Sequence, residues 1–99
     1  MNLIRLKRVV IGGFQAVSGD EQIRIYDIEN DIYINPRHIV HVEQGKESWK
    51  LRLSNGITDS IVTEIYLSTG EVVTVAEHPV AIMKKIEEVQ IRISVYGER

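Results

Sequence analysis

The chain of 99 residues lacks cysteine altogether, which excludes both a fold held by disulfides and a metal site built from thiolates. Long apolar runs are missing too: the uncharged residues 9–16, which include two glycines, fall far below the roughly 20 apolar residues that span a membrane. Neither charge dominates, because 12 Lys+Arg residues face 14 Asp+Glu residues. We therefore expect a soluble protein without the strongly basic surface of a general nucleic-acid binder.

A chain of this length supports one hydrophobic core, so residues 1–99 are expected to form a single domain. Residues 1–11 contain three cations, but neither an apolar core nor a small-residue cleavage site follows them. We accordingly expect no signal peptide.

Apolar and polar residues alternate over most of the chain, which is the pattern of strands that bury one face. The expected strands cover residues 3–11, 14–17, 22–28, 32–34, 38–43, 49–53, 57–68 and 71–76. The alternation breaks near Arg8, which predicts a bulge or a local twist. Gly12-Gly13 predicts a turn and Glu29–Asp31 the end of a strand.

Two further signals place corners between strands. Asn35-Pro36 predicts a change of direction, because proline cannot donate to a strand ladder and restricts the residue before it. Asn55-Gly56 predicts a hairpin with a type I′ turn, which needs positive φ at both central residues. The long strand 57–68 is expected to bend near Asp59-Ser60.

The period of the apolar residues changes after His78. Pro79 suits the first position of a helix, where its missing N–H costs nothing. The pattern predicts a helix over residues 79–90 with an apolar stripe that packs on the sheet, formed by Val80, Met83, Ile86 and Val89 with Ile82 beside them. Residues 91–96 alternate again and favour a final strand, with continuation of the helix as the alternative.

These elements together predict a mainly β domain of the α+β class. We expect a small twisted antiparallel sheet or partly open barrel of six to eight strands, with one C-terminal helix at residues 79–90 packed on it. Residues 48–63 are expected to form an inserted β-hairpin that projects from the sheet.

Two segments of the chain carry a family resemblance. Residues 33–43 contain Asn35-Pro36 and, three residues after Pro36, Ile39, and residues 64–90 contain Leu67-Ser68-Thr69-Gly70, Glu77 and the expected helix. This order resembles the FlbD-like proteins of flagellar operons and similar small bacterial and phage proteins, which are β domains with a terminal helix. The resemblance implies no catalytic motif, and residues 48–63 would be an addition to the family pattern. The composition, with no cysteine and no excess of cations, fits a cytoplasmic protein, of a bacterial cell or a phage-infected host.

The residue types that carry catalysis or bind metals are not arranged in known patterns. His38 and His41 are three residues apart, which in a strand sends them to opposite faces, and no pair of carboxylates completes a ligand set. The chain contains neither a Gly-x-Ser-x-Gly elbow nor a spaced-glycine phosphate loop. We expect a protein without enzymatic activity, metal or cofactor.

The charges are grouped in blocks of opposite sign. Residues 1–8 and 37–52 are mainly cationic, whereas residues 20–31 and 59–77 are mainly anionic. Such blocks suit contacts between copies of one protein. Trp49 fits a core in line with Leu51 and Leu53, but on a projecting hairpin it fits an interface, and both interpretations stay open. The candidate partner-binding residues are Trp49, Lys50, Arg52, Tyr66 and Arg37.

The leading hypothesis is a non-enzymatic interaction or assembly module that forms a homo-oligomer, encoded by a phage or mobile element. Its partner would be a second copy or another protein, with no membrane involved. One alternative is a small β-rich regulator that binds nucleic acid through Arg37, Lys50 and Arg52, although the acidic residues 59–77 would repel phosphate. The other is an oligomer that binds a small anionic ligand, such as a nucleotide, between its subunits.

Overall fold

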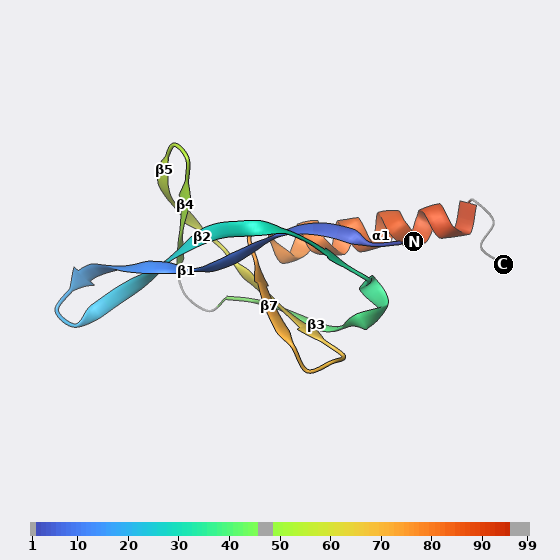
Figure 1. Cartoon of the computed structure of the whole chain (residues 1–99), viewed down its shortest axis with the longest axis horizontal. Coiled ribbons are helices and arrows are strands. Elements are labelled where there is room, and N and C mark those ends of the chain that lie inside the picture. The colour runs from blue at the N-terminus through green and yellow to red at the C-terminus, as the bar shows by residue number, and fades with distance from the viewer. Residues whose placement is uncertain (1, 46–48, 96–99) are drawn as a thin grey trace.

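The computed structural model describes residues 2–45 and 49–95, and the side chains of Val17, Trp49 and residues 91–95 are not described. It confirms the expected fold class, because a curled sheet forms half a barrel and one C-terminal helix packs on it (Figure 1). The molecule is elongated, with extents of 58 × 30 × 19 Å.

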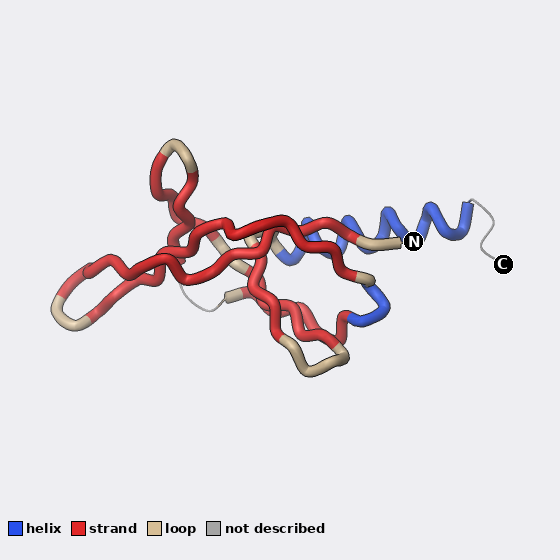
Figure 2. Tube along the Cα trace, viewed as in Figure 1, coloured by secondary structure: helices blue, strands red, loops and turns tan. Residues whose placement is uncertain are grey.

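The elements follow one another along the chain as seven strands, one short 3₁₀ turn and a helix. They are β1 (Ile4–Ser18), β2 (Glu21–Ile34), η1 (Pro36–His38), β3 (Ile39–Gln44), β4 (Trp49–Leu53), β5 (Gly56–Ser60), β6 (Thr63–Leu67), β7 (Val72–Val75) and α1 (Pro79–Val95). Most of the chain is strand (Figure 2), and the order across the sheet is β3-β6-β7-β1-β2-β4-β5. Neighbouring strands of the described chain are antiparallel, as expected, except that β2 and β4 run parallel.

Two long ribbons and the short strand β7 make up this sheet. The first consists of β1 and β2, and in the second β3 pairs with β6 and β4 pairs with β5. The second ribbon bends between these two halves, at Gly45 on one strand and Ile61-Val62 on the other, where the Gly45 N–H donates to the Val62 carbonyl at 2.9 Å. Its inner half reaches β1 through β7, and its outer half reaches β2 through β4. The second ribbon therefore meets the first on both sides, and this curls the sheet.

The first ribbon is longer than the sequence indicates. β1 continues through Gly12-Gly13 and β2 through Glu29–Asp31, so the predicted turn and the predicted strand end are both wrong. The chain instead reverses at Gly19, whose φ of 56° favours glycine. Register shifts occur at both places where breaks were expected. Gly12 is the unpaired residue between Ile11 and Gly13, whereas beside Arg8 the unpaired residue is Glu29 on β2, so that bulge lies on the partner strand. A bulge and a turn give the same local sequence signal, and only pairing distinguishes them.

The hairpin predicted at Asn55-Gly56 is present, but its turn is of another type. Leu53 pairs with Gly56, so Ser54 and Asn55 form the turn, and no non-glycine residue of the described chain has positive φ. Type I′ is therefore wrong; Gly56, with φ of 132°, provides the left-handed residue after the turn instead. The long strand expected over residues 57–68 is divided into β5 and β6, close to the predicted bend.

Two hydrophobic cores lie along the first ribbon. The first joins β1, β2, β6, β7 and α1 through Ile4, Leu6, Ile34, Ile65, Val73, Val75, Ile82 and Val89. The second consists of Val9, Tyr26, Leu51 and Val62. The buried side chains of β1 are those of Ile4, Leu6 and Val9. Because Leu6 and Val9 are three residues apart, their side chains lie on opposite faces of the strand. The second core thus lies where the two ribbons cross.

The buried stripe of α1 differs from the predicted one. Ile82, Ile86 and Val89 face the first core, whereas Val80 and Met83 are exposed. Val80 and Val89 are nine residues apart, about two and a half helical turns, and so point to opposite sides. The final strand expected over residues 91–96 is wrong as far as Val95, because α1 continues there, and Tyr96 lies outside the described residues. No glycine or proline interrupts the helix between Val89 and Val95.

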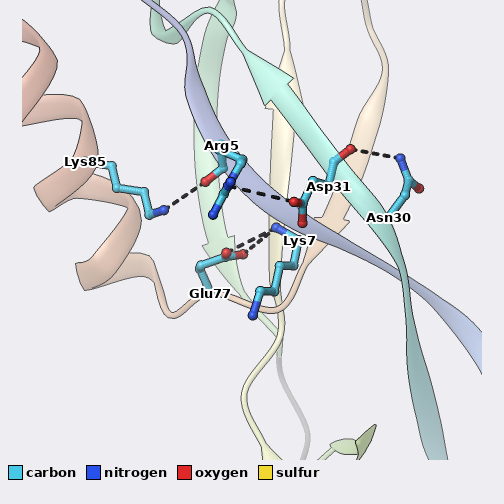
Figure 3. A network of polar contacts seen from close by, with 6 residues as sticks. All are labelled: Arg5, Lys7, Asn30, Asp31, Glu77 and Lys85. Carbon is cyan, nitrogen blue, oxygen red and sulfur yellow. Dashed lines mark hydrogen bonds and ion pairs between the residues drawn. The ribbon is translucent and has the colours of Figure 1, made fainter. Parts of the chain in front are cut away.

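Polar side chains close the side of β1 that β7 leaves open (Figure 3). The Lys7 N–H donates to both carboxylate oxygens of Glu77, at 3.0 and 3.1 Å, and Lys85 Nζ donates to the Arg5 carbonyl at 2.8 Å. The fully buried Thr63 hydroxyl donates to the Glu77 carbonyl at 2.6 Å. Backbone groups that would form an open edge are therefore paired, and α1 is positioned by the same contacts.

We expect Glu77→Ala to lower the free energy of unfolding by about 1–2 kcal/mol, because the Lys7 N–H loses a charged acceptor. Urea unfolding followed by circular dichroism measures the change. Glu88→Ala, on the exposed side of α1, is the matched control and should change stability little. Equal effects of the two variants would show that the Glu77 contact does not hold β1.

Candidate interaction surface

The structure does not bring the five predicted contact residues together. Lys50 and Arg52 lie on β4, whereas Tyr66 lies on β6, with β7, β1 and β2 between them in the sheet. Arg37 belongs to η1. Trp49 begins β4 opposite Ser60, but its side chain lies outside the described residues. A single surface formed by all five is therefore not present.

Both cations of β4 are paired with carboxylates on neighbouring strands. Lys50 Nζ lies 2.8 Å from Asp59 Oδ1, and Arg52 Nη1 lies 3.5 Å from Asp27 Oδ2. The strand register sets each cation directly opposite its acid. These local partners reduce the positive potential available to a phosphate, so the arrangement gives the nucleic-acid alternative little support.

The two glycines of β1 make room for the ion pair between Asp27 and Arg52. A Cβ atom at Gly12 would overlap the Asp27 carboxylate, whereas one at Gly13 would lie 3.7 Å from Arg52 Nη2, an ordinary contact. The Asp27–Arg52 pair joins the two parallel strands at the end of their common ladder. Gly12 therefore supports the register of β4 on β2.

Tyr66 is part of a polar cluster on β3 and β6. Its ring centroid lies 5.5 Å from that of His41, and its hydroxyl donates to Glu43 Oε2 at 3.4 Å. Glu43 and Glu64 are direct partners across the two strands. The negative charge of Glu64 raises the pKa of Tyr66, and burial and Glu43 raise it further. Among the residues that the structure describes, no group of three His, Cys, Asp or Glu side chains is arranged to hold a metal ion.

Arg37 lines a groove between η1 and the second half of α1. Asn35 caps η1, since its Oδ1 accepts from the Arg37 N–H at 3.0 Å. The groove has a volume of about 450 Å³ and is lined by Asn2, Asn35, Pro36, Arg37, Ile86, Val89 and Gln90. Its lining is mixed, with one cation and several amides, and the small anionic ligand stays a prediction.

Sequence reasoning missed an exposed apolar surface at the end of the sheet away from α1. It consists of Ile11, Phe14, Ile28 and Leu53, whose exposed fractions are 49%, 58%, 38% and 37%. Directly opposed residues share a face, and the register sets Ile11 opposite Tyr26 and Ile28 opposite Val9. Phe14 lies opposite Arg24, two residues from Tyr26, and Leu53 follows Leu51 by two residues. We call this surface, with the second core from which it extends, the Tyr26 face.

Part of the Tyr26 face lies on a projecting arm, residues 14–24, the β1–β2 hairpin at the left of Figure 1. Its two strands pair with each other, while β7 meets β1 at Arg8 and β4 meets β2 over Ile25–Asp27. An isolated two-stranded hairpin is only marginally stable in water. The apolar, strand-like residues around Phe14 were the available signal, but the turn expected at Gly12-Gly13 concealed the length of the arm.

Comparison of the chain with protein-family models, curated proteins and solved structures finds no match. The FlbD-like resemblance, the phage or mobile-element source and the cytoplasmic location therefore stay predictions. Within residues 2–45 and 49–95, no helix is long and apolar enough to cross a membrane.

We expect Gly12→Ala to destabilise the fold by about 0.5–1 kcal/mol, because the new methyl group displaces the Asp27 carboxylate and breaks its partly exposed ion pair with Arg52. Gly13→Ala is a matched control with room for the methyl group, and should be neutral or slightly stabilising. Thermal unfolding of both variants, and of Gly12→Ala combined with Asp27→Ala, measures the effect. The interpretation is wrong if Gly12→Ala costs as little as Gly13→Ala, or if removing the Asp27 side chain restores nothing.

The pKa of Tyr66 should lie above its ordinary value of about 10. The folded protein then keeps the phenol proton to higher pH than the unfolded chain, so the contribution to stability is complete below pH about 10 and is lost as pH rises further. Ultraviolet titration of the wild type against Tyr66→Phe isolates this group. Glu64→Gln should move the pKa down, whereas Glu71→Gln, outside the cluster, should leave it unchanged.

Proposed function

We propose that the protein is a non-enzymatic interaction and assembly module that associates with copies of itself. The observation that supports this most is the Tyr26 face, on which four large apolar side chains continue outward from a core without being covered. Contiguous apolar surface beside a core is typical of interaction sites rather than of ordinary solvent-exposed faces.

The shape of the chain supports the same proposal. Its radius of gyration is 15.6 Å, whereas about 13 Å is expected of a compact domain of this length. The arm and the β4–β5 hairpin project from the sheet, and α1 extends from the opposite end of the molecule (Figure 1). A symmetric contact between two copies would cover such surfaces, and two-fold dimers are the commonest protein assemblies.

The chemistry of the candidate residues is also that of binding rather than catalysis. Lys50 and Arg52 hold strands together through Asp59 and Asp27. The side chains of the Tyr26 face contribute apolar area, and aromatic residues such as Phe14 dominate the energy of many interfaces.

The mass in solution tests the proposal. Light scattering coupled to gel filtration should give a value above the monomer mass of 11.3 kDa for the wild type, rising with concentration. Phe14→Ser should weaken association by about 30-fold, because loss of an aromatic anchor costs about 2 kcal/mol. It should leave the fold intact, since the side chain is 58% exposed.

Val80→Ser is the matched control, because Val80 is 68% exposed on α1, away from the Tyr26 face. It should leave the mass unchanged. A wild type that is monomeric at every concentration, or equal weakening by both variants, would contradict the proposal.

A further inference from the structure

The outer edge of the sheet at β5 is open and lacks the usual protection against pairing with another strand. β5 is the last strand in the sheet order, and Gly56–Asp59 are all exposed. Natural edge strands are commonly protected by lysine, proline or a bulge. β5 contains neither lysine nor proline, and its ladder with β4 is regular over five residue pairs. Its one charged residue, Asp59, is already paired with Lys50.

The opposite edge, β3, is different. A register shift between Ile39 and His41 interrupts its ladder with β6, and the chain enters it from the proline-containing turn η1. Bulges and prolines of this kind hinder strand addition. Of the two outermost strands in the order of the described sheet, β5 is therefore the one suited to accept a further strand.

We propose that β5 pairs antiparallel with β5 of a second copy, about a two-fold axis at Thr58. This inference rests on the proposed self-association and adds the β5 edge to the Tyr26 face as a second contact between copies. A two-residue turn makes Leu53 and Gly56 a hydrogen-bonded pair, and such pairs alternate along the ladder. The backbone N–H and C=O groups of Ile57 and Asp59 are therefore directed outward, toward the second copy.

The axis at Thr58 follows from the side chains. It sets each Ile57 opposite Asp59 of the second copy, so that the outward N–H and C=O groups of both residues are paired. It also sets Thr58 opposite Thr58 of the second copy, which is a favourable cross-strand pair. An axis at Asp59 would set two carboxylates opposite each other, which is unfavourable. An axis at Ile57 would have to use Asn55, which belongs to the turn rather than the strand.

Cysteine cross-linking tests the register, because the wild-type chain has no cysteine. In the proposed pairing the two Thr58 residues form a non-hydrogen-bonded pair, with Cα atoms about 4.5 Å apart, within the range of a disulfide. Thr58→Cys should give a covalent dimer under mild oxidation about tenfold faster than Thr69→Cys, an exposed turn residue in β6–β7. Ile57→Cys should react slowly, because its two copies would be diagonal and about 7–8 Å apart.

Faster cross-linking at residue 57 than at residue 58, or equal rates at residues 58 and 69, would overturn the proposal. Measurement of the mass in solution distinguishes a failure of the β5 edge inference from a failure of the proposed self-association. Thr58→Lys should reduce association at least tenfold and Thr69→Lys should not, with circular dichroism showing that both are folded. If the wild type associates and Thr58→Lys associates equally well, the edge inference is wrong while self-assembly stands. If the wild type is monomeric, both are wrong.

Discussion

The packing of Val62 with Val9, Tyr26 and Leu51 is the contact on which the rest of the structure depends. It lies at the bend of the second ribbon, where the Gly45 N–H and the Val62 carbonyl keep the two strands together. Because the bend is anchored on the first ribbon, the inner half of the second ribbon can continue to β7 and its outer half to β4. The half-barrel shape follows from this one crossing.

The crossing also determines which polar groups meet. β4 lies parallel to β2, and this register sets Arg52 beside Asp27. On the other side of β4, Lys50 forms its ion pair with Asp59 of β5. Gly12 matters because the Asp27 carboxylate occupies the space of a side chain at that position. At the other end, Glu77 and Lys85 supply the partners that β7 does not give to β1. Charged residues thus act mainly as connections between strands.

The same geometry explains why the surfaces suited to binding gather at one end. Helix α1 covers the first core, but no helix of the described chain covers the second, so its apolar surface continues onto Ile11, Phe14, Ile28 and Leu53. The β5 edge belongs to the same end of the sheet. A face and an edge exposed together suit a partner that adds both strands and apolar area, as a second copy of the chain would.

Local patterns in the sequence determined the fold class, the irregular pairing near Arg8, the hairpin close to Asn55-Gly56 and the start of the helix at Pro79, because alternation and turn chemistry involve residues that are neighbours in the chain. The length of β1, the parallel pairing of β4, the buried face of α1 and the ion pairs of Lys50 and Arg52 depended on tertiary structure. Each of these is set by residues far apart in the sequence. The need for glycine at position 12 comes from the Asp27 carboxylate, and the ion pair of Arg52 forms only because β4 pairs with β2. The exposed position of Phe14 likewise follows from the absence of a third strand along the described arm, which no local pattern records.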